Sequence, residues 1–404
     1  MSDCIRIYET QSHVRSFEAR VLRCLPVEEL QPGKWKDCWA SELDQTAFFP
    51  GGGGQECDKG TLDGQEVLHV QELDHVIWHI TAQPLQTGSN VHGELDWDLR
   101  FSCMQNHSGE HIFSGLVHSR FGYDNVGFHM GHAAITMDFN GEITPEQLRE
   151  LEYEANRVIT NNLYIKILFP SDADLSDMDY RSKIELSGRR VRIVEIPGVD
   201  LCACCAPHVE QTGEIGMLKV LSGQRYKQGT RVSILCGFRW LHEANEGYGI
   251  LHELGVRMSA SQEKLLDYYE GFVRDQKQLQ GQLESVSAAL IQRIVREYTQ
   301  NAQKYDAEPI VLEIVLADSI AMRKLCNELV PCTKRFVFVY HMKNDTDANF
   351  LLASASENCR EIFAEFQKAF EGKVRGGGSP AMVQGSCQVA PEALKGHFLG
   401  TFLR

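Results

Sequence analysis

The sequence lacks long apolar runs and any excess of positive charge. No stretch approaches the roughly 18 uninterrupted apolar residues that a membrane-spanning helix needs, and the segment from Met1 to Arg6 has no apolar signal core. These absences predict a cytoplasmic protein without a membrane partner. The 40 Lys and Arg against 55 Asp and Glu give a net charge of −15, which excludes a generally basic nucleic-acid coat protein.

Cysteine is abundant, but its pattern does not indicate disulfides. The 13 cysteines are an odd number and are spread from Cys4 to Cys387 in a chain without a secretory signal. We interpret them as reduced thiols, some of them metal ligands. The length of 404 residues and the ordinary content of 43% hydrophobic residues predict two or three globular domains.

The hydrophobic patterning predicts an α+β fold that begins with two dissimilar domains. Residues 1–92 carry short alternating segments, such as 66–70 and 75–80, around the glycine-rich loop 48–55, which predicts a β-rich N-terminal domain. Residues 93–245 are expected to form a second domain, of α+β type. In it, one helix runs from a cap at Asp98 to Arg120, and a second runs over 145–161 behind a Thr144 cap. Strands are predicted at 165–168, 192–196 and 232–235.

The second half of the chain predicts a helical connector and a small C-terminal domain. Residues 246–305 form the connector, in which apolar positions from Leu265 to Leu290 alternate in steps of four and three, with Gln276 as a polar interruption. A helix packed within its own chain is favoured over an intermolecular coiled coil. Residues 306–404 predict an α/β domain with strands at 310–316, 336–340 and 350–355 and helices at 319–329 and 361–370.

Two pairs of metal-binding side chains recur at a spacing of four residues. His107 and His111 share one face of the predicted helix, and Cys204 and His208 form a second pair about ninety residues later. Three imidazole nitrogens and one thiolate complete a tetrahedral set for zinc, which accepts both ligand types. The sequence therefore predicts one Zn²⁺ per chain.

Nearby cysteines and histidines offer alternative ligands. Cys202 and Cys205 flank Cys204 and are interpreted as packing residues or as residues behind the ligands. His129 and His132 are only three residues apart ahead of an alternating segment, and they are expected to line the site or lie at the surface rather than bind the ion.

The two histidine and cysteine motifs, preceded by the loop 48–55, resemble the editing domain of alanyl-tRNA synthetase and the free-standing AlaX alanyl-tRNA editing proteins. The segment from Arg375 to Gly385 is similar to the glycine-rich part of the synthetase's C-terminal DHH-associated domain. The similarity thus spans nearly the whole chain in the arrangement of the long AlaX form. Since no aminoacylation core has a counterpart here, the protein is not expected to bind ATP or charge tRNA.

The resemblance implies a zinc-dependent hydrolase that acts in trans on alanine tRNA mischarged with serine or glycine. It implies that Thr46 contacts the seryl hydroxyl, although a turn threonine that bonds its own backbone is the alternative. Gln55 is expected near the ester, and Gly51 stands where related motifs carry an acidic residue. If four protein ligands bind at once, the zinc shell is closed, so zinc either activates water through an expanded or loosened shell or anchors the amino group.

Glu110 creates a rival interpretation. The run from His107 to His111 matches the His-x-x-Glu-His pattern of inverzincin metallopeptidases, with Glu185 as the best-spaced third ligand. That class leaves Cys204 and His208 unexplained. We therefore interpret Glu110 as a residue at the surface or behind the ligands.

Positive charge is concentrated in one segment despite the acidic total. Residues 181–231 hold nine Lys or Arg against five acids, so they predict a surface for the tRNA acceptor end. The candidate phosphate contacts there are Arg189, Arg190, Arg192, Arg225 and Lys227, and those of the C-terminal domain are Lys334, Arg335 and Arg375.

The C-terminal glycine run and the class of the protein each have alternative interpretations. The C-terminal glycine run is not a Walker phosphate loop, because no Gly-Lys-Ser/Thr follows, and a mobile linker is its alternative. Two other classes of protein fit the sequence. One is a non-catalytic zinc-stabilised tRNA-binding protein, and the other is a zinc-dependent dimer scaffold. A homodimer would form through the connector or the C-terminal domain.

Overall fold

The computed structural model describes residues 4–131, 134–182, 190–315 and 319–400. Helices and strands are mixed along the chain, which divides into two compact units, Met1–Glu253 and Leu254–Arg404. Within the described residues, no helix is both long and apolar enough to cross a membrane.

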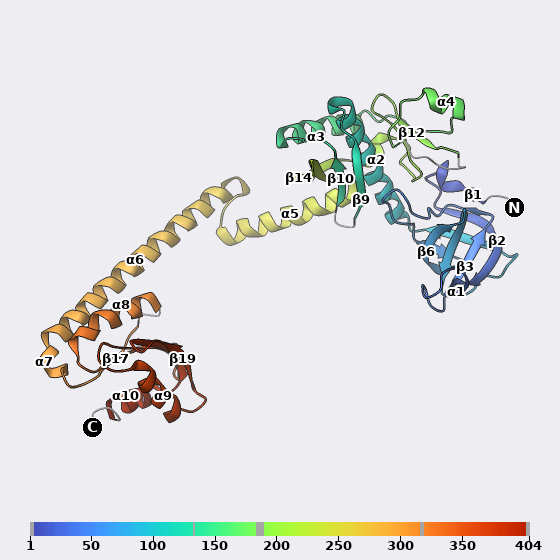
Figure 1. Cartoon of the computed structure of the whole chain (residues 1–404). Helices are drawn as coiled ribbons and strands as arrows, with labels where there is room; N and C mark the ends of the chain where they lie inside the picture. The colour runs from blue at the N-terminus through green and yellow to red at the C-terminus, as the bar shows by residue number, and fades with distance from the viewer. Residues whose placement is uncertain (1–3, 132–133, 183–189, 316–318, 401–404) are drawn as a thin grey trace. The chain divides into compact units, whose positions relative to one another are not determined.

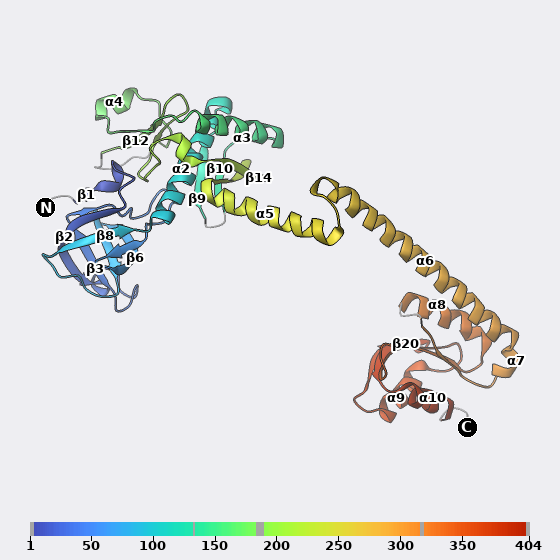
Figure 2. The same cartoon turned by 180° about the vertical axis from the view of Figure 1, so that it is seen from behind.

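The N-terminal part of the first unit is a closed β-barrel (Figures 1 and 2). Its strands follow the spatial order β2 (Ser16–Pro26), β3 (Trp39–Leu43), β7 (Val76–Thr81), β6 (Gln65–Leu73), β5 (Gly60–Leu62) and β8 (Asn90–Leu95). Buried and exposed residues alternate along β8, as expected for a strand with one face toward a core. Four short elements lie beside the barrel. Strand β1 (Ile5–Arg6) pairs with β4 (Gln45–Thr46), and the two short helices are η1 (Ile7–Glu9) and α1 (Val27–Leu30).

A buried helix, α2 (Trp97–Phe121), lies next to the barrel in Figures 1 and 2. Its cap is Asp96, whose side chain accepts a hydrogen bond from the Leu99 amide at 3.1 Å. The expected cap, Asp98, was wrong because the helix begins two residues earlier than expected, and Asp98 lies in its first turn. Nearly every residue of its middle is buried, so α2 forms the centre of the region that follows the barrel.

Two sheets and a second helix surround α2. The larger sheet has the order β14 (Leu218–Tyr226), β15 (Gly229–Cys236), β10 (Ile135–Phe139) and β9 (Asn125–Met130), and the smaller has β11 (Lys166–Leu168), β12 (Ile193–Ile196) and β13 (Asp200–Ala203). The predicted second helix is α3 (Pro145–Thr160), in which Thr144 and Gln147 form a reciprocal capping box. Shorter helices are α4 (Asp172–Asp177) and η2 (Thr212–Ile215).

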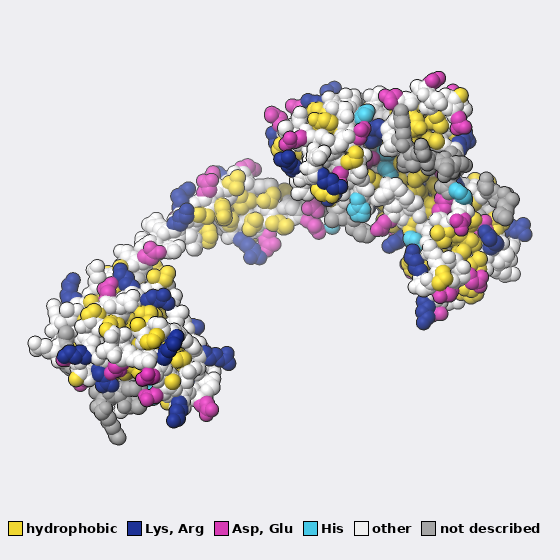
Figure 3. Space-filling view, in the orientation of Figure 1, with side chains coloured by type: hydrophobic (Ala, Val, Ile, Leu, Met, Phe, Trp, Pro, Cys, Tyr) yellow, Lys and Arg dark blue, Asp and Glu magenta, His cyan; other side chains and the backbone are white. Residues whose placement is uncertain are grey.

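Long helices follow β15. They are α5 (Gly237–Met258), η3 (Gln262–Lys264) and α6 (Leu265–Gln300), followed by α7 (Ala302–Tyr305). Apolar side chains gather on the visible face of α5 (Figure 3). On α6, the seam residues Phe272, Leu279 and Val286 are exposed, whereas Ile291 is buried in a core shared with α8 (Ser319–Leu329).

The second unit contains a sheet in the order β16 (Ile310–Glu313), β17 (Phe336–Met342), β18 (Asp347–Ser354), β20 (Met382–Gln388) and β19 (Val374–Gly378). Its other helices are η4 (Val330–Cys332), α9 (Cys359–Ala369) and α10 (Pro391–Gly400). The glycine run belongs to β19, where Gly376 pairs with Gly385 of β20. The linker alternative for this run was therefore wrong.

Candidate metal centre and active site

Two segments far apart in the sequence bring the predicted metal ligands together. His107 and His111 lie on α2, and Cys204 and His208 lie in the loop after β13. One donor atom from each of the four residues lies within 4.8 Å of all the others. This convergence makes the group a candidate metal centre.

The distances between the donor atoms suit zinc. Cys204 Sγ lies 3.4 Å from His208 Nε2 and 3.6 Å from His107 Nε2. A tetrahedral ion with bonds of about 2.0 Å to nitrogen and 2.3 Å to sulfur separates such donors by about 3.5 Å. The four residues therefore fit the predicted ion in both chemistry and spacing.

Each histidine of the group is oriented by a partner at its other ring nitrogen. The Nδ1 atom of His107 lies 2.7 Å from Gln55 Oε1, and that of His111 lies 2.9 Å from Asp200 Oδ2. The Nδ1 atom of His208 lies 3.0 Å from Ser108 Oγ. Because partners of this kind fix ring orientation and tautomer, Nε2 of each ring is left for an ion.

The electrostatics of the group favour metal-binding forms of two ligands. Burial lowers the pKa of His208 to about 3, so its imidazole is neutral near pH 7. Burial raises the pKa of the Cys204 thiol, but the neighbouring imidazoles, His107 foremost, outweigh it and bring that pKa well below its usual value. A neutral imidazole and a thiolate are the forms that bind zinc.

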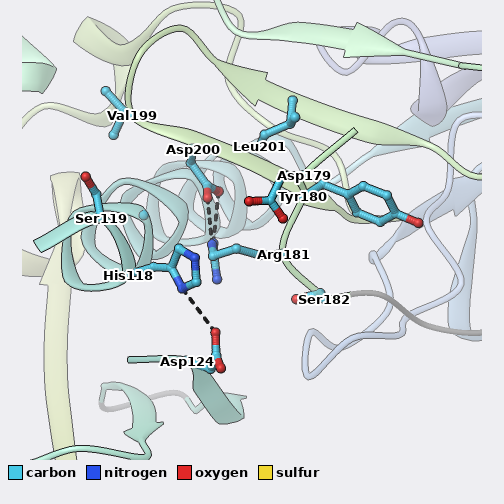
Figure 4. A pocket seen from close by; sticks show the side chains of 11 residues that line it. His118, Ser119, Asp124, Asp179, Tyr180, Arg181, Ser182, Val199, Asp200 and Leu201 are labelled. Atoms are coloured by element: carbon cyan, nitrogen blue, oxygen red, sulfur yellow. Dashed lines mark hydrogen bonds and ion pairs between the residues drawn. The ribbon is translucent and has the colours of Figure 1, made fainter. Parts of the chain in front are cut away.

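Asp200 is held from two sides, by His111 and by Arg181. Figure 4 shows its pair with Arg181. The Arg181 guanidinium donates to Oδ1 at 2.6 Å and to Oδ2 at 2.9 Å. Burial raises the pKa of Asp200, but its hydrogen bonds to His111 and Arg181 outweigh this and lower it. Although His111, Asp200 and Cys202 also lie close enough to hold an ion, Arg181 already compensates this carboxylate, so we interpret Asp200 as the support of His111.

A cavity of about 280 Å³ opens beside the ligands. It is lined by residues of the N-terminal segment, the glycine-rich loop, α2, β9 and the β13 region: Arg6, Glu9, Gly53, His107, Glu110, His111, Asn125, Phe128, Arg181, Ser182, Arg190, Arg192, Cys202, Ala203, Cys204 and Cys205. The glycine-rich loop lies so close to β9 that a Cβ on Gly54 would be 2.6 Å from the Phe128 ring. Glycine is therefore required there.

Gln55 joins this loop to the metal centre. Its Oε1 contacts His107, and its buried Nε2 has no hydrogen-bond partner in the part of the chain that the structure describes. An unpaired buried amide is costly, so a ligand that accepts a hydrogen bond from Nε2 would be favoured beside His107.

Glu110 is buried and lines the same cavity. Glu110 was expected at the surface or behind the ligands. The surface alternative was wrong, because α2 is enclosed along its middle and residues 107 and 110 share one helical face. His129, in contrast, is exposed on β9. His132 and Glu185 lie outside the described residues.

Thr46 lies inside the barrel region, and it is not among the residues that line the cavity. Its Oγ1 lies 2.8 Å from His79 Nε2 and accepts a hydrogen bond from the Phe48 amide at 3.1 Å. His79 Nδ1 lies 3.2 Å from the Ser41 carbonyl oxygen, and burial lowers the pKa of His79 to about 4. Nδ1 therefore carries the proton and donates, and the Thr46 hydroxyl donates to Nε2.

The predicted phosphate contacts occupy different environments. Arg190 is exposed and lines the cavity, whereas the buried Arg192 donates to the backbone oxygens of Glu9, Cys204 and Ala206. Arg192 thus supports the ligand loop. Arg225 and Lys227 are exposed at the β14–β15 hairpin, Arg375 is exposed on β19, and Arg189 lies outside the described residues.

The sequence reasoning missed Arg100, which connects α2 to the loop before Asp58. Arg100 is 0% exposed and donates to Asp58, to the Ala47 carbonyl oxygen and, at 3.1 Å, to the Ser12 carbonyl oxygen. Asp58 also accepts from the Phe49 amide at 2.6 Å. Charged side chains are rarely buried unless they are paired. An arginine on a helix that is otherwise enclosed was therefore the signal that could have identified this ion pair.

Comparison with known proteins first identifies a class of domain. The profile of the threonyl and alanyl tRNA synthetase second additional domain matches residues 191–233. This stretch includes β12, β13, Cys204 and His208. One of the two ligand pairs thus lies in a domain of synthetase type.

The similar curated proteins are more specific. The chain is 26% identical to the alanyl-tRNA editing protein AlaX-L of Pyrococcus horikoshii over 96% of each chain. It is 28% identical to the alanyl-tRNA editing protein Aarsd1 of Danio rerio, over 66% of this chain and 67% of that protein. The alanine–tRNA ligase of Pyrococcus furiosus is 28% identical over 81% of this chain, which spans only 36% of the ligase. These matches confirm the resemblance to the long alanyl-tRNA editing proteins.

Proposed function

We propose that the protein is a trans-editing hydrolase that deacylates alanine tRNA mischarged with serine and with glycine. The observation that carries the proposal is the convergence of His107, His111, Cys204 and His208 beside a cavity that the glycine-rich loop also lines. The similarity to alanyl-tRNA editing proteins over nearly the whole chain supports the same reaction. The proposed location is the cytoplasm.

The proposed cofactor is one Zn²⁺ held by the four converging residues. A bound zinc ion would supply positive charge next to the ester. Gln55 orients His107, Asp200 orients His111, and Ser108 orients His208. The chain thus contributes a preorganised pocket in which the ester is held and bulk water is limited.

The decisive experiment follows ester loss from seryl-tRNA and alanyl-tRNA, both on the alanine-specific tRNA, with and without a chelator. We expect rapid, chelator-sensitive loss of serine, while alanine is largely spared. Glycyl-tRNA on the same tRNA measures the second proposed substrate. Bound metal together with stable esters would favour the non-catalytic tRNA-binding alternative, which the complete four-donor set would also suit.

Thr46 is the proposed specificity residue within this function. We expect Thr46→Val to reduce the ratio of seryl to alanyl hydrolysis by about tenfold, since an unmatched polar group costs on the order of 1–3 kcal/mol. Because Thr46 donates to His79, both ester rates are measured together with thermal unfolding.

Thr81→Val is the matched control for Thr46, since Thr81 is also buried in the barrel and donates to the Gln83 carbonyl oxygen. An unchanged ratio in Thr46→Val would leave Thr46 with a purely structural role.

The proposed tRNA contacts are the exposed side chains of the basic segment and of the C-terminal domain. Arg190, beside the cavity, would take a phosphate near the acceptor end, and Arg225 and Lys227 would contact the backbone further away. Arg375 would act in the second unit, for which we propose a DHH-associated domain.

We further propose a homodimer through the exposed seam of α6, where Phe272, Leu279 and Val286 have no apolar cover among the described residues. Light scattering over a concentration series tests this, and a monomer at every concentration would exclude it.

A further inference from the structure

Glu110 lies beside the metal centre, and no role has yet been assigned to it. It follows His107 by three residues on α2, precedes His111, and is only 5% exposed while lining the cavity. A buried carboxylate that faces a cavity is unusual unless it is paired or functional.

The two oxygens of this carboxylate have different surroundings. Oε1 accepts hydrogen bonds from Ser114 Oγ and, at 2.8 Å, from Asn125 Nδ2. Oε2 accepts none from the described residues and lies 3.9 Å from His111 Nε2. The support at Oε1 therefore fixes the carboxylate with its other oxygen next to the metal centre.

The donor set itself creates a need for such a group. If all four donors held one zinc ion, they would complete a tetrahedral shell, as in structural zinc sites, and water would have no position on the ion. A side chain of the cavity would then have to take the proton from the attacking water.

Two other candidate bases of the cavity, one carboxylate and one thiol, are already engaged. The Glu9 carboxylate pairs with Arg6 at 3.8 Å. The Cys202 thiol donates to Ser182 Oγ at 3.4 Å and contacts the Ala203 carbonyl oxygen. Glu110 is the remaining acidic side chain among the described residues that line the cavity.

We propose that Glu110 is a catalytic residue, the general base of the hydrolysis; this inference rests on the proposed editing function. Oε2 accepts a hydrogen bond from water and takes its proton as the water oxygen bonds to the ester carbonyl carbon. The bond from that carbon to the tRNA ribose oxygen then breaks, and Glu110 returns the proton to the ribose oxygen. One water is consumed, and a free amino acid and an uncharged tRNA leave.

The test replaces Glu110 by glutamine, which has the same shape. The Gln carbonyl oxygen can keep the hydrogen bonds from Ser114 and Asn125, while an amide nitrogen that cannot take a proton replaces Oε2. In single-turnover and steady-state deacylation of seryl-tRNA, we expect kcat to fall at least roughly 100-fold and KM to change less than about threefold. Metal content and thermal unfolding are expected to match the unsubstituted protein.

Glu150→Gln is the matched control, because Glu150 is exposed on α3 and pairs with Arg120 outside the cavity. It is expected to deacylate at the normal rate. Normal turnover by Glu110→Gln, or a loss of metal that accounts for its inactivity, would overturn the proposal.

If Glu110→Gln does not fold, Glu110→Asp replaces it. Lowered kcat with normal metal content supports the proposal, and an unchanged kcat overturns it. Failure of the unsubstituted protein to cleave either ester would instead refute the proposed function, so the two failures are distinguishable.

Discussion

Cys204→Ala is expected to lose the metal and the deacylase activity while the chain stays folded. Cys204 supplies the single thiolate of the donor set. Its Sγ lies 3.4 Å from His208 Nε2 and 3.6 Å from His107 Nε2. Changes to groups that only orient a ligand already cost about 10–100-fold in metal affinity. Loss of the ligand itself is therefore expected to cost more than roughly 100-fold.

The measurement is metal content after gel filtration and affinity by competition with a coloured chelator, alongside seryl-tRNA hydrolysis. Cys205→Ala is the control for metal content, since Cys205 adjoins Cys204 but does not belong to the converging donors. Circular dichroism follows folding. A Cys204→Ala variant with full metal and full turnover would show that the ion, if it acts, is held by other residues.

The candidate metal ligands were predictable because their signal is local. Spacings of four residues place His107 with His111, and Cys204 with His208, whatever the rest of the chain does. The two pairs converge as expected. The supports of these ligands were not predictable, because Gln55 lies 52 residues from His107 and Asp200 lies 89 residues from His111.

Sequence separation also explains which other predictions succeeded and which failed. The capping box at Thr144 was predicted because its partners are three residues apart. The choice of Asp98 over Asp96 failed because two acidic residues compete within three positions, and helix ends are the least certain boundaries. The glycine run was ambiguous because glycine has low strand propensity, and only the register with β20 decides its conformation.

The most severe loss of stability is expected from Arg100→Met. This change leaves the buried Asp58 carboxylate without its cation and removes the donors to the Ala47 and Ser12 carbonyl oxygens. Breaking a buried ion pair by removing one partner costs about 3–5 kcal/mol. Because Asp58 holds the Phe49 amide at 2.6 Å, deacylation should fall as well, through displacement of the glycine-rich loop.

Urea unfolding followed by tryptophan fluorescence measures this cost in the first unit alone, since all five tryptophans lie within Met1–Glu253. Arg23→Met is the matched control, because the Arg23–Glu42 pair has a half-exposed guanidinium, and exposed pairs contribute less than about 1 kcal/mol. The double variant Arg100→Met/Asp58→Asn should recover part of the stability, because it no longer buries an unpaired charge. A cost for Arg100→Met as small as that of the control would mean that the ion pair does not hold α2 against the barrel loop.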